Sequence, residues 1–365
     1  MAVYAGRRWT RQELVSRIGD PAQVAGARGS ILTDGKADGV RAIEVVTGSG
    51  FSFTVLPGRG MDIAHASHRG KALSFISGTG ITAPAYYEEP GAAWLRTFYA
   101  GLLTTCGITN CGAPSVDQGK PFGLHGRVSN AAAENLSVQQ DWEGDEYEIR
   151  LAGTVRETTA MNENMSLARR IETRLGAKGF RLCDTVVNRG FEPQPLMLLY
   201  HFNYGFPLLS ADSRIVGPIR KTEPRDEEAR KGAGVEECLR FPEPVAGYRE
   251  KVFFHTTAAD SKGRTFIALV NRDIGDGTAL AVVARWNAKE LPHLTEWKMP
   301  CRGFYVLGLE PGTVQPIGRG PLREKGMLPL LGGQESYSIT IDFEVLDSAA
   351  ELDSIEAEAA RTLSV

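Results

Sequence analysis

Two histidines lie in sequence contexts that favour a chemical role. His201 interrupts the apolar run 198–206 and precedes Asn203 by two residues, so an extended backbone would place both side chains on one face. His125 precedes Arg127 by the same spacing in a glycine-rich segment. Neutral imidazole is suited to proton transfer near physiological pH. We predict that both histidines line a pocket; the alternative for each is a structural role in the core.

A carboxylate and an aromatic side chain could complete such a pocket. Glu310 ends the apolar segment 305–309, just before a Pro-Gly turn. It is either the solvated end of a strand or a base whose pKa is raised by partial burial. Trp297 offers a flat face for the C–H side of a ring, and Lys298 beside it offers a hydrogen-bond donor. These residues predict acid–base chemistry.

Arg59 and Asp62 form an earlier candidate pair in the segment Leu-Pro-Gly-Arg-Gly-Met-Asp-Ile at 56–63. Glycines on both sides of Arg59 leave its side chain unobstructed and allow a tight turn. The pair either binds a ligand or closes a turn through an Arg–Asp contact. The sequence lacks a P-loop, a G-x-G-x-x-G fingerprint, a G-x-S-x-G nucleophile elbow and an H-E-x-x-H zinc motif.

Composition excludes several classes of partner. The 365 residues are 42% hydrophobic and 23% charged, which is ordinary for a soluble globular protein. A formal charge of −3 argues against a general affinity for nucleic acid or anionic lipid. The first eleven residues contain no apolar signal segment, and no run approaches the ~18 apolar residues of a membrane span. We expect a cytoplasmic protein with neither nucleic acid nor membrane as partner.

The cysteines form no recognised metal or redox pattern. Their number is odd, and no C-x-x-C occurs. Cys106 and Cys111 could pair, but reduced thiols are the simpler expectation in the cytoplasm. The five are Cys106, Cys111, Cys183, Cys238 and Cys301.

Alternating apolar and polar residues dominate the chain and indicate half-buried strands. The clearest case is 336–346, where Tyr337, Ile339, Ile341, Phe343 and Val345 share one face. Further strands are predicted at 51–56, 146–151, 166–175, 181–187, 266–271, 279–286 and 303–309. With few helices and no strand–helix alternation, this pattern predicts an all-β protein of antiparallel sheets packed face to face.

Helical signals occur near the two ends. A capping-box spacing from Thr10 to Glu13 predicts a short helix. Helical spacing of Leu352, Ile355, Ala359 and Leu363 predicts another near the C-terminus. We therefore expect an N-terminal helical extension at 1–30, one β domain at 31–346 and a C-terminal helix at 347–365. The charged segment 219–236 is predicted as a solvated loop, or alternatively as a flap over a binding site.

Several of these segments, in this order, resemble the aldose 1-epimerase (galactose mutarotase-like) superfamily, and its DUF4432 branch in particular. The resemblance covers about residues 30–346 and implies a single β-supersandwich with short terminal helices and a sugar-binding cleft on one sheet. The segments that carry it are LPGRGMDI at 56–63, PAYYEEPGAAWLRTFYAGLLTTCG at 84–107, FGLHGRVSN at 122–130, LYHFNYGFPLL at 199–209 and LPHLTEWKM…YVLGLEPGT at 291–313.

The resemblance implies an aldose 1-epimerase that needs no cofactor or metal and whose partner is a small sugar. By motif, Glu310 matches the base on the anomeric hydroxyl, His201 the acid on the ring oxygen, and His125 a second histidine near that oxygen. Arg59 matches a substrate-binding arginine. Asp62, Arg127, Asn203, Trp297 and Lys298 are the further substrate-binding candidates. A homodimer is compatible with the sequence.

Two features depart from ordinary galactose mutarotases. Tyr200 stands where an asparagine often precedes the acid histidine, and the aspartate usually found between that histidine and the glutamate has no clear counterpart. The cations Arg59, Arg127 and Lys298 exceed the need of a neutral hexose and predict an acidic sugar, such as a uronate, sulfo-sugar or phosphosugar.

Two other functions stay open at this point. His125, His201 and Glu310 could bind a divalent metal for a sugar isomerase or epimerase acting away from C1. The fold could also serve a non-catalytic carbohydrate-binding protein in which Trp297, Tyr86 and Tyr87 stack on the ligand. For the mutarotase, both catalytic side chains must reach one sugar, so we expect their functional atoms to lie about a pyranose width apart.

Overall fold

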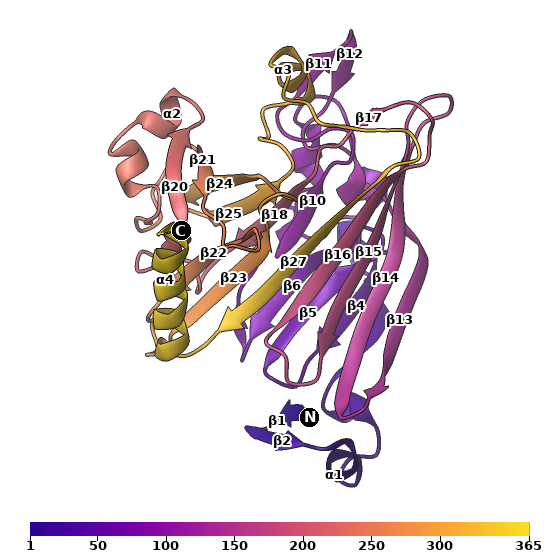
Figure 1. Ribbon diagram of the computed structural model, residues 1–365, viewed down its shortest axis with the longest axis vertical. Helices are drawn as coiled ribbons and strands as arrows, with labels where there is room; N and C mark the ends of the chain where they lie inside the picture. The colour runs from indigo at the N-terminus through magenta and orange to yellow at the C-terminus, as the bar shows by residue number, and fades with distance from the viewer. Residues whose placement is uncertain (365) are drawn as a thin grey trace.

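Two large antiparallel sheets pack against each other and contain most of the strand residues (Figure 1). The computed structural model describes residues 1–364. The larger sheet has eleven strands, in the order β20 (Ile219–Pro224), β21 (Lys251–Thr257), β24 (His293–Cys301), β25 (Phe304–Gly312), β18 (Leu199–Tyr204), β10 (Leu103–Cys106), β6 (Asp62–His68), β5 (Phe51–Leu56), β4 (Arg41–Val46) and β3 (Gly26–Ile31), with β7 (Lys71–Ala72) beside β6.

The second sheet has eight strands, and its order places β27 between two groups of consecutive strands. From edge to edge it reads β13 (Ala133–Glu143), β14 (Glu146–Thr158), β15 (Asn164–Arg174), β16 (Gly179–Asn188), β27 (Ser336–Leu346), β23 (Leu280–Asn287), β22 (Arg264–Asn271) and β19 (Arg214–Val216). Each strand predicted from period-two alternation forms a strand here, which confirms the all-β prediction. Strands β5 and β27 begin and end at the predicted residues.

Small two-stranded sheets and short helices complete the fold. The two-stranded sheets are β1 (Ala2–Tyr4) with β2 (Arg7–Trp9), β8 (Phe75–Ile76) with β9 (Ala100–Gly101), β11 (Ser115–Asp117) with β12 (Lys120–Phe122), and β17 (Gln194–Pro195) with β26 (Leu330–Leu331). The helices are α1 (Arg11–Val15), α2 (Glu227–Arg230), α3 (Arg319–Glu324) and α4 (Ala349–Leu363). Single 3₁₀ turns lie at Pro21–Gln23, Gly35–Ala37, Pro84–Tyr86, Ala93–Thr97, Val128–Asn130 and Gly234–Glu237.

Aromatic rings from both sheets meet in the main core. Phe53 on β5 lies 5.2 Å from Phe180 on β16, and Phe202 on β18 stacks on Phe343 of β27 at 5.8 Å. Such pairs add to the stabilisation that comes from burying their area. Because Phe202 points into this core, the neighbouring His201 must point to the other face of the large sheet.

The two ends of the chain differ in how well the sequence predicted them. Leu352, Ile355 and Ala359 of α4 are buried against β22 and β23, as expected, but Leu363 is exposed and Thr362 packs inward instead. The N-terminal helical extension is a wrong prediction in most of its length. The capping box at Thr10 is present, but α1 has only five residues. Along the chain it follows strands β1 and β2 and precedes the edge strand β3.

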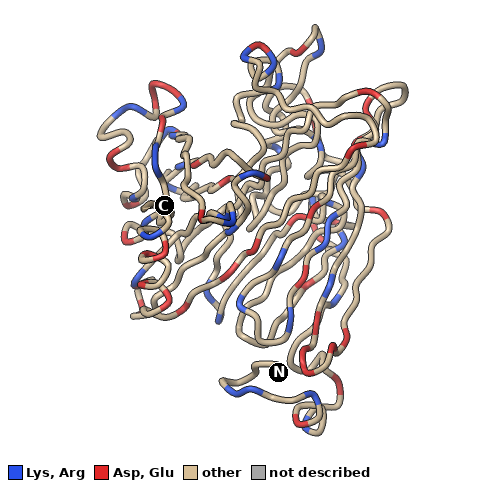
Figure 2. The backbone as a smooth tube through the Cα atoms, viewed as in Figure 1, with Lys and Arg blue, Asp and Glu red and all other residues tan. Residues whose placement is uncertain are grey.

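The charged segment 219–236 is not a free loop. Figure 2 shows basic and acidic residues mixed along it. Its first part is β20, which pairs with β21 at the edge of the large sheet, and its second part contains α2. Ala229 is buried there with Cys238 and Phe253. The solvated-loop prediction is therefore wrong.

Two sequence-based expectations concern the environment of the protein. All five cysteines are free thiols. No helix within residues 1–364 is long and apolar enough to cross a membrane.

Candidate active site

The candidate residues meet on the face of the large sheet that points away from the second sheet. Their strands β10, β18, β25 and β24 are neighbours, so residues far apart in sequence form rows across the sheet. The register pairs Thr104 with His201, places His201 opposite Glu310, and pairs Glu310 with Thr295. The next row contains Asn203, Gly308 and Trp297.

His201 and Glu310 are in direct contact. The distance from His201 Nε2 to Glu310 Oε1 is 3.1 Å, and the two side chains are 6% and 3% exposed. The expectation that a pyranose width separates them is therefore wrong for this structure. The register explains the contact, because directly opposed residues on one sheet face have Cβ atoms about 5 Å apart.

Burial shifts the pKa values of this pair in opposite directions. Burial raises the pKa of Glu310 well above its usual value, and the charge of Glu250 adds to this effect while Arg225 opposes it. Burial lowers the pKa of His201 well below its usual value, and His125 lowers it further. Both shifts favour neutral groups, so the pair holds one transferable proton near neutral pH.

His125 lies beside this pair. Its ring is 5.8 Å from the ring of His201, nearly perpendicular to it, and 4.7 Å from the ring of Trp94. Burial lowers the pKa of His125 to about 4, so the imidazole is neutral at physiological pH. Its backbone has a positive φ of 59°, which is uncommon outside glycine and directs the side chain out of the Gly-rich segment.

Aromatic rings surround the histidines. Trp297 lies 5.4 Å from His201 in an edge-to-face arrangement, and Phe98 lies 5.5 Å from the same imidazole. Phe304 contacts Trp297 from the other side, with 6.0 Å between ring centroids. The sequence analysis identified Trp297 but missed the roles of Trp94, Phe98 and Phe304. Trp94 and Phe98 lie in the segment 84–107, and the spacing of aromatic residues in that segment could have indicated that they line the site.

Several polar atoms at this site are buried without a hydrogen-bond partner within residues 1–364. They are His125 Nδ1, His201 Nδ1, Asn203 Oδ1, Thr295 Oγ1 and Glu310 Oε1. Glu310 Oε1 belongs to this set although it lies 3.1 Å from His201 Nε2, because that contact does not have the geometry of a hydrogen bond. Buried polar atoms in folded proteins are nearly always paired, so such a concentration indicates a place for a polar ligand or water. A Cβ added at Gly308 would lie 2.6 Å from Glu310 Oε1 and 3.0 Å from His201 Cε1, so glycine keeps this space open.

A second buried His–Glu pair shows what a structural pair looks like in the same protein. His255 Nε2 lies 2.9 Å from Glu296 Oε2, on the opposite face of the large sheet. His255 Nδ1 also has a partner, Thr222 Oγ1, at 2.8 Å. Both ring nitrogens of His255 are thus used by the protein, whereas Nδ1 of His201 is free. His201 differs from His255 in this respect, while His68, which pairs with Asp347, also has an Nδ1 without a partner.

Arg59 does not reach the site, which corrects the prediction that it binds substrate. Its side chain is buried, and its guanidinium donates to three backbone carbonyls: Ser129 at 2.6 Å, Thr97 at 3.1 Å, and Thr82. All three carbonyls belong to loops beside the sheet. Arg59 therefore holds these loops together, and each of its three guanidinium nitrogens already donates to a backbone carbonyl.

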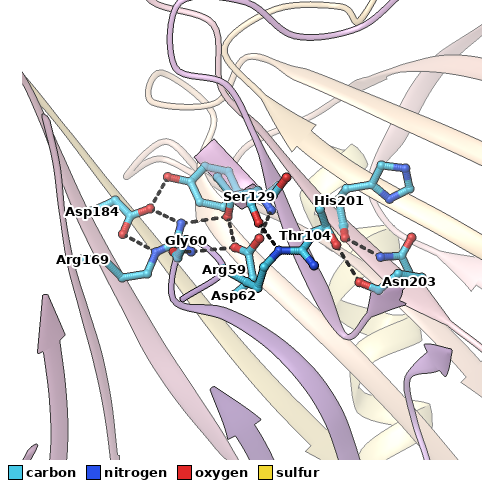
Figure 3. Close-up of polar contacts among 12 residues, drawn as sticks. Arg59, Gly60, Asp62, Thr104, Ser129, Arg169, Asp184, His201 and Asn203 are labelled. Carbon is cyan, nitrogen blue, oxygen red and sulfur yellow. Dashed lines mark hydrogen bonds and ion pairs between the residues drawn. The ribbon is translucent and has the colours of Figure 1, made fainter. Parts of the chain in front are cut away.

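Asp62 is also structural, which corrects its assignment as a substrate-binding residue. Its carboxylate accepts from Arg169 Nη1 at 3.0 Å (Figure 3). It also accepts from Thr105, and the side chains of Asp62, Thr105 and Arg169 are all buried. Arg169 also binds Asp184 at 2.7 Å. Burial raises the pKa of Asp62, while Arg169 acts in the opposite sense. The predicted Arg59–Asp62 turn exists through a backbone bond, but the side chains bind different partners.

The other two cations are paired as well, which removes the basis for predicting an acidic sugar. Arg127 forms a two-pronged ion pair with Glu89, with nitrogen–oxygen distances of 2.7 Å to both carboxylate oxygens. Lys298 points to the opposite face from Trp297, and its Nζ donates to the carbonyls of Glu237, Cys238 and Arg240. Lys298 therefore does not share the sheet face of His201, which corrects its assignment as a substrate-binding residue.

A cavity of about 430 Å³ lies next to His125. Gly123, Gly126 and Arg127 line it on the side of the histidine, and Glu157 and Glu163 line it on the side of the second sheet. Within residues 1–364, no group of three or more His, Cys, Asp or Glu side chains has the arrangement of a metal site.

The fold defines a class, since solved structures of galactose mutarotase-like proteins share this architecture. A protein from Klebsiella pneumoniae named a "putative aldose 1-epimerase" is 25% identical, with a TM-score of 0.87 over 94% of this chain and 90% of that one. A galactose 1-epimerase from Lactobacillus acidophilus is 13% identical, with a TM-score of 0.57 over 89% and 99% of the two chains, and shows the fold alone.

Within this class the family can be named. Residues 37–345 match the model of the family described as Domain of unknown function (DUF4432), so the chain belongs to that family. A galactose mutarotase-like protein from Clostridium acetobutylicum shares the fold at 14% identity, with a TM-score of 0.59 over 89% of this chain and all of that one. No curated protein matches the sequence.

Proposed function

We propose that this protein is an aldose 1-epimerase-like enzyme that interconverts the anomers of a free, uncharged sugar. The observation that carries this proposal is the buried contact between His201 and Glu310, surrounded by polar atoms without partners. The pairing of Arg59, Arg127 and Lys298 within the protein supports an uncharged substrate. The aromatic rings around the pair would cover the C–H faces of a pyranose.

The pair supplies the two proton transfers that mutarotation needs. When its proton lies on His201, that residue can protonate the ring oxygen, and the Glu310 carboxylate can take the proton of the anomeric hydroxyl. The C1–O5 bond then breaks, the open aldehyde rotates, and ring closure returns both protons. Each positioned acid or base contributes about 10²–10⁴ in rate. His125 is neutral, lies beside His201 and has an unpartnered Nδ1, which supports a role for it in binding the sugar near the ring oxygen.

Exchange NMR tests the proposal directly. We expect the protein to accelerate α–β exchange of at least one aldose in a panel of D-glucose, D-galactose, L-arabinose and D-xylose. The rate is measured against the spontaneous exchange in the same buffer. Saturation transfer from the protein to a sugar, without faster exchange of any sugar in the panel, would favour the carbohydrate-binding alternative.

The rate of anomer exchange should vary little with pH over a broad range around neutrality. Because burial lowers the pKa of His201, the pair gains a second proton below the ordinary histidine value of ~6.5, and activity falls on the acid side there. Because burial raises the pKa of Glu310, the pair loses its last proton well above ~4.3, which sets the alkaline limit. We expect kcat/KM, corrected for spontaneous exchange, to be level between these limits. A loss of activity on the acid side centred at ~6.5 would contradict the lowered pKa of a buried His201.

Chelation distinguishes the metal-dependent alternative. With His201 Nε2 directed at Glu310, the pair acts through a proton and needs no ion between the two atoms. We expect exchange to be unchanged after dialysis against EDTA. Loss of activity in EDTA, with recovery on adding a divalent ion and stoichiometric metal by elemental analysis, would support an isomerase or epimerase acting away from C1.

A further inference from the structure

The only polar atom of the Trp297 indole is Nε1, and it donates a hydrogen bond to a carboxylate that lies outside strand β24. Trp297 Nε1 donates to Glu250 Oε2 at 2.8 Å. Glu250 immediately precedes β21, and its side chain is 49% exposed. Because the indole lies edge-on to His201, this hydrogen bond fixes one wall of the site from its rim.

Glu250 is itself held by a charged neighbour. Its Oε1 accepts from Arg225 Nη2 at 3.0 Å, and Arg225 Nε donates to Asp226 at 2.8 Å. The backbone of Arg225 donates to Val252, and Val252 pairs with Trp297 across β21 and β24. These contacts place Arg225, Val252 and Trp297 along one row of the sheet.

The charge in contact with the indole is the Glu250 carboxylate. It faces Arg225, which Asp226 shares, whereas the flanking cations Arg249 and Lys251 lie near Glu228 and Glu237. Glu250 also acts on Glu310, whose pKa it raises in addition to the effect of burial. An anionic sugar approaching Trp297 would therefore meet the Glu250 carboxylate, which accepts the indole N–H.

We propose that Glu250 is a positioning and specificity residue of this site: it orients the Trp297 indole as the platform for a sugar ring, and its charge disfavours anionic sugars. Arg225 keeps Glu250 in the orientation that binds the indole. The inference that Glu250 disfavours anionic sugars rests on the proposed function. The inference that Glu250 orients Trp297 is independent of that function.

Two substitutions separate the hydrogen bond from the charge. Glu250→Gln keeps an oxygen that can accept from the indole but removes the negative charge. Glu250→Ala removes both. Glu243→Gln, at an exposed position in the same loop, is the matched control.

The first measurement needs no turnover. The fluorescence of Trp297 is obtained by subtracting the emission of the same protein carrying Trp297→Phe. Its quenching is measured with iodide, an anionic quencher, and with acrylamide, a neutral one. We expect Glu250→Gln to raise the iodide quenching constant about two-fold without changing that of acrylamide, because the local potential becomes less negative. Glu250→Ala should raise both constants. Equal iodide quenching in wild type and Glu250→Gln would overturn the charge role, and an unchanged acrylamide constant in Glu250→Ala would overturn the positioning role.

The second measurement concerns specificity. Saturation-transfer NMR compares D-glucose and D-galactose with D-glucuronate and D-galacturonate. We expect wild type to prefer the neutral sugars, Glu250→Gln to reduce that preference at least three-fold, and Glu250→Ala to weaken the neutral sugars about ten-fold. A preference of wild type for the uronates would overturn the specificity role. If no sugar binds any of the proteins, the proposed function and the specificity role both fail, and the quenching result still decides whether Glu250 positions Trp297.

Discussion

Glu310→Gln and His201→Asn should each lower the rate of anomer exchange at least about 10²-fold while leaving the protein folded. Both substitutions nearly preserve the size of the side chain, and each removes one member of the pair that is in contact at 3.1 Å. The double variant should lose little more than either single variant, because the two groups act on one transition state. Exchange NMR gives the rates, and thermal melts report folding.

Matched controls come from exposed positions on other strands. His65→Asn on β6 and Glu344→Gln on β27 make equivalent chemical changes away from the site and should leave the exchange rate unchanged. Near-normal exchange in a folded Glu310→Gln protein would contradict the catalytic role of Glu310. Strictly multiplicative losses in the double variant would contradict action of the two residues as a pair.

Arg169→Met should destabilise the protein by about 3–5 kcal/mol, the usual cost of removing one partner from a buried ion pair. Arg169 lies between Asp62 of the large sheet and Asp184 of the second sheet, and all three side chains are fully buried. Burial opposes its charge, yet the two carboxylates raise its pKa above the ordinary value. Its loss would leave two carboxylates in the core without a cation.

Arg181→Met provides the comparison within the same sheet. Arg181 pairs with Asp342 on the surface, where the side chains are 55% and 44% exposed. Exposed pairs contribute about 0–1 kcal/mol, so this variant should be close to wild type in urea unfolding. Equal midpoints for Arg169→Met and Arg181→Met would show that the buried network is not a major source of stability.

The buried network also connects to the candidate site. Tyr200 donates to Asp184 Oδ2 at 2.7 Å, and Tyr200 is the residue before His201 on β18. The strand that presents His201 outward is thus anchored inward by its neighbour. This contact gives a physical reason for a tyrosine at position 200, where the resemblance to mutarotases would suggest asparagine.

Local patterns predicted the strands and the orientation of their side chains. The alternation in β27 needs no information beyond eleven consecutive residues, because side chains on a strand point to opposite faces in turn. The same rule placed His201 and Asn203 on one face of β18, and Tyr200 and Phe202 on the other. The structure agrees, since Tyr200 and Phe202 lie in the core between the sheets.

The sequence therefore determined which residues become strands, which face of β18 carries polar groups, and which family the chain resembles. The tertiary structure alone decided which charges are free. Arg59, Arg127 and Lys298 look like ligand-binding cations in the sequence, but each finds its partner in the fold, in carbonyls of other loops or in Glu89. It also brought His201 against Glu310, 109 positions later in the chain, and Glu250 against Trp297. Periodicity is a property of neighbouring residues, whereas electrostatic pairing depends on distances that only strand order and register fix.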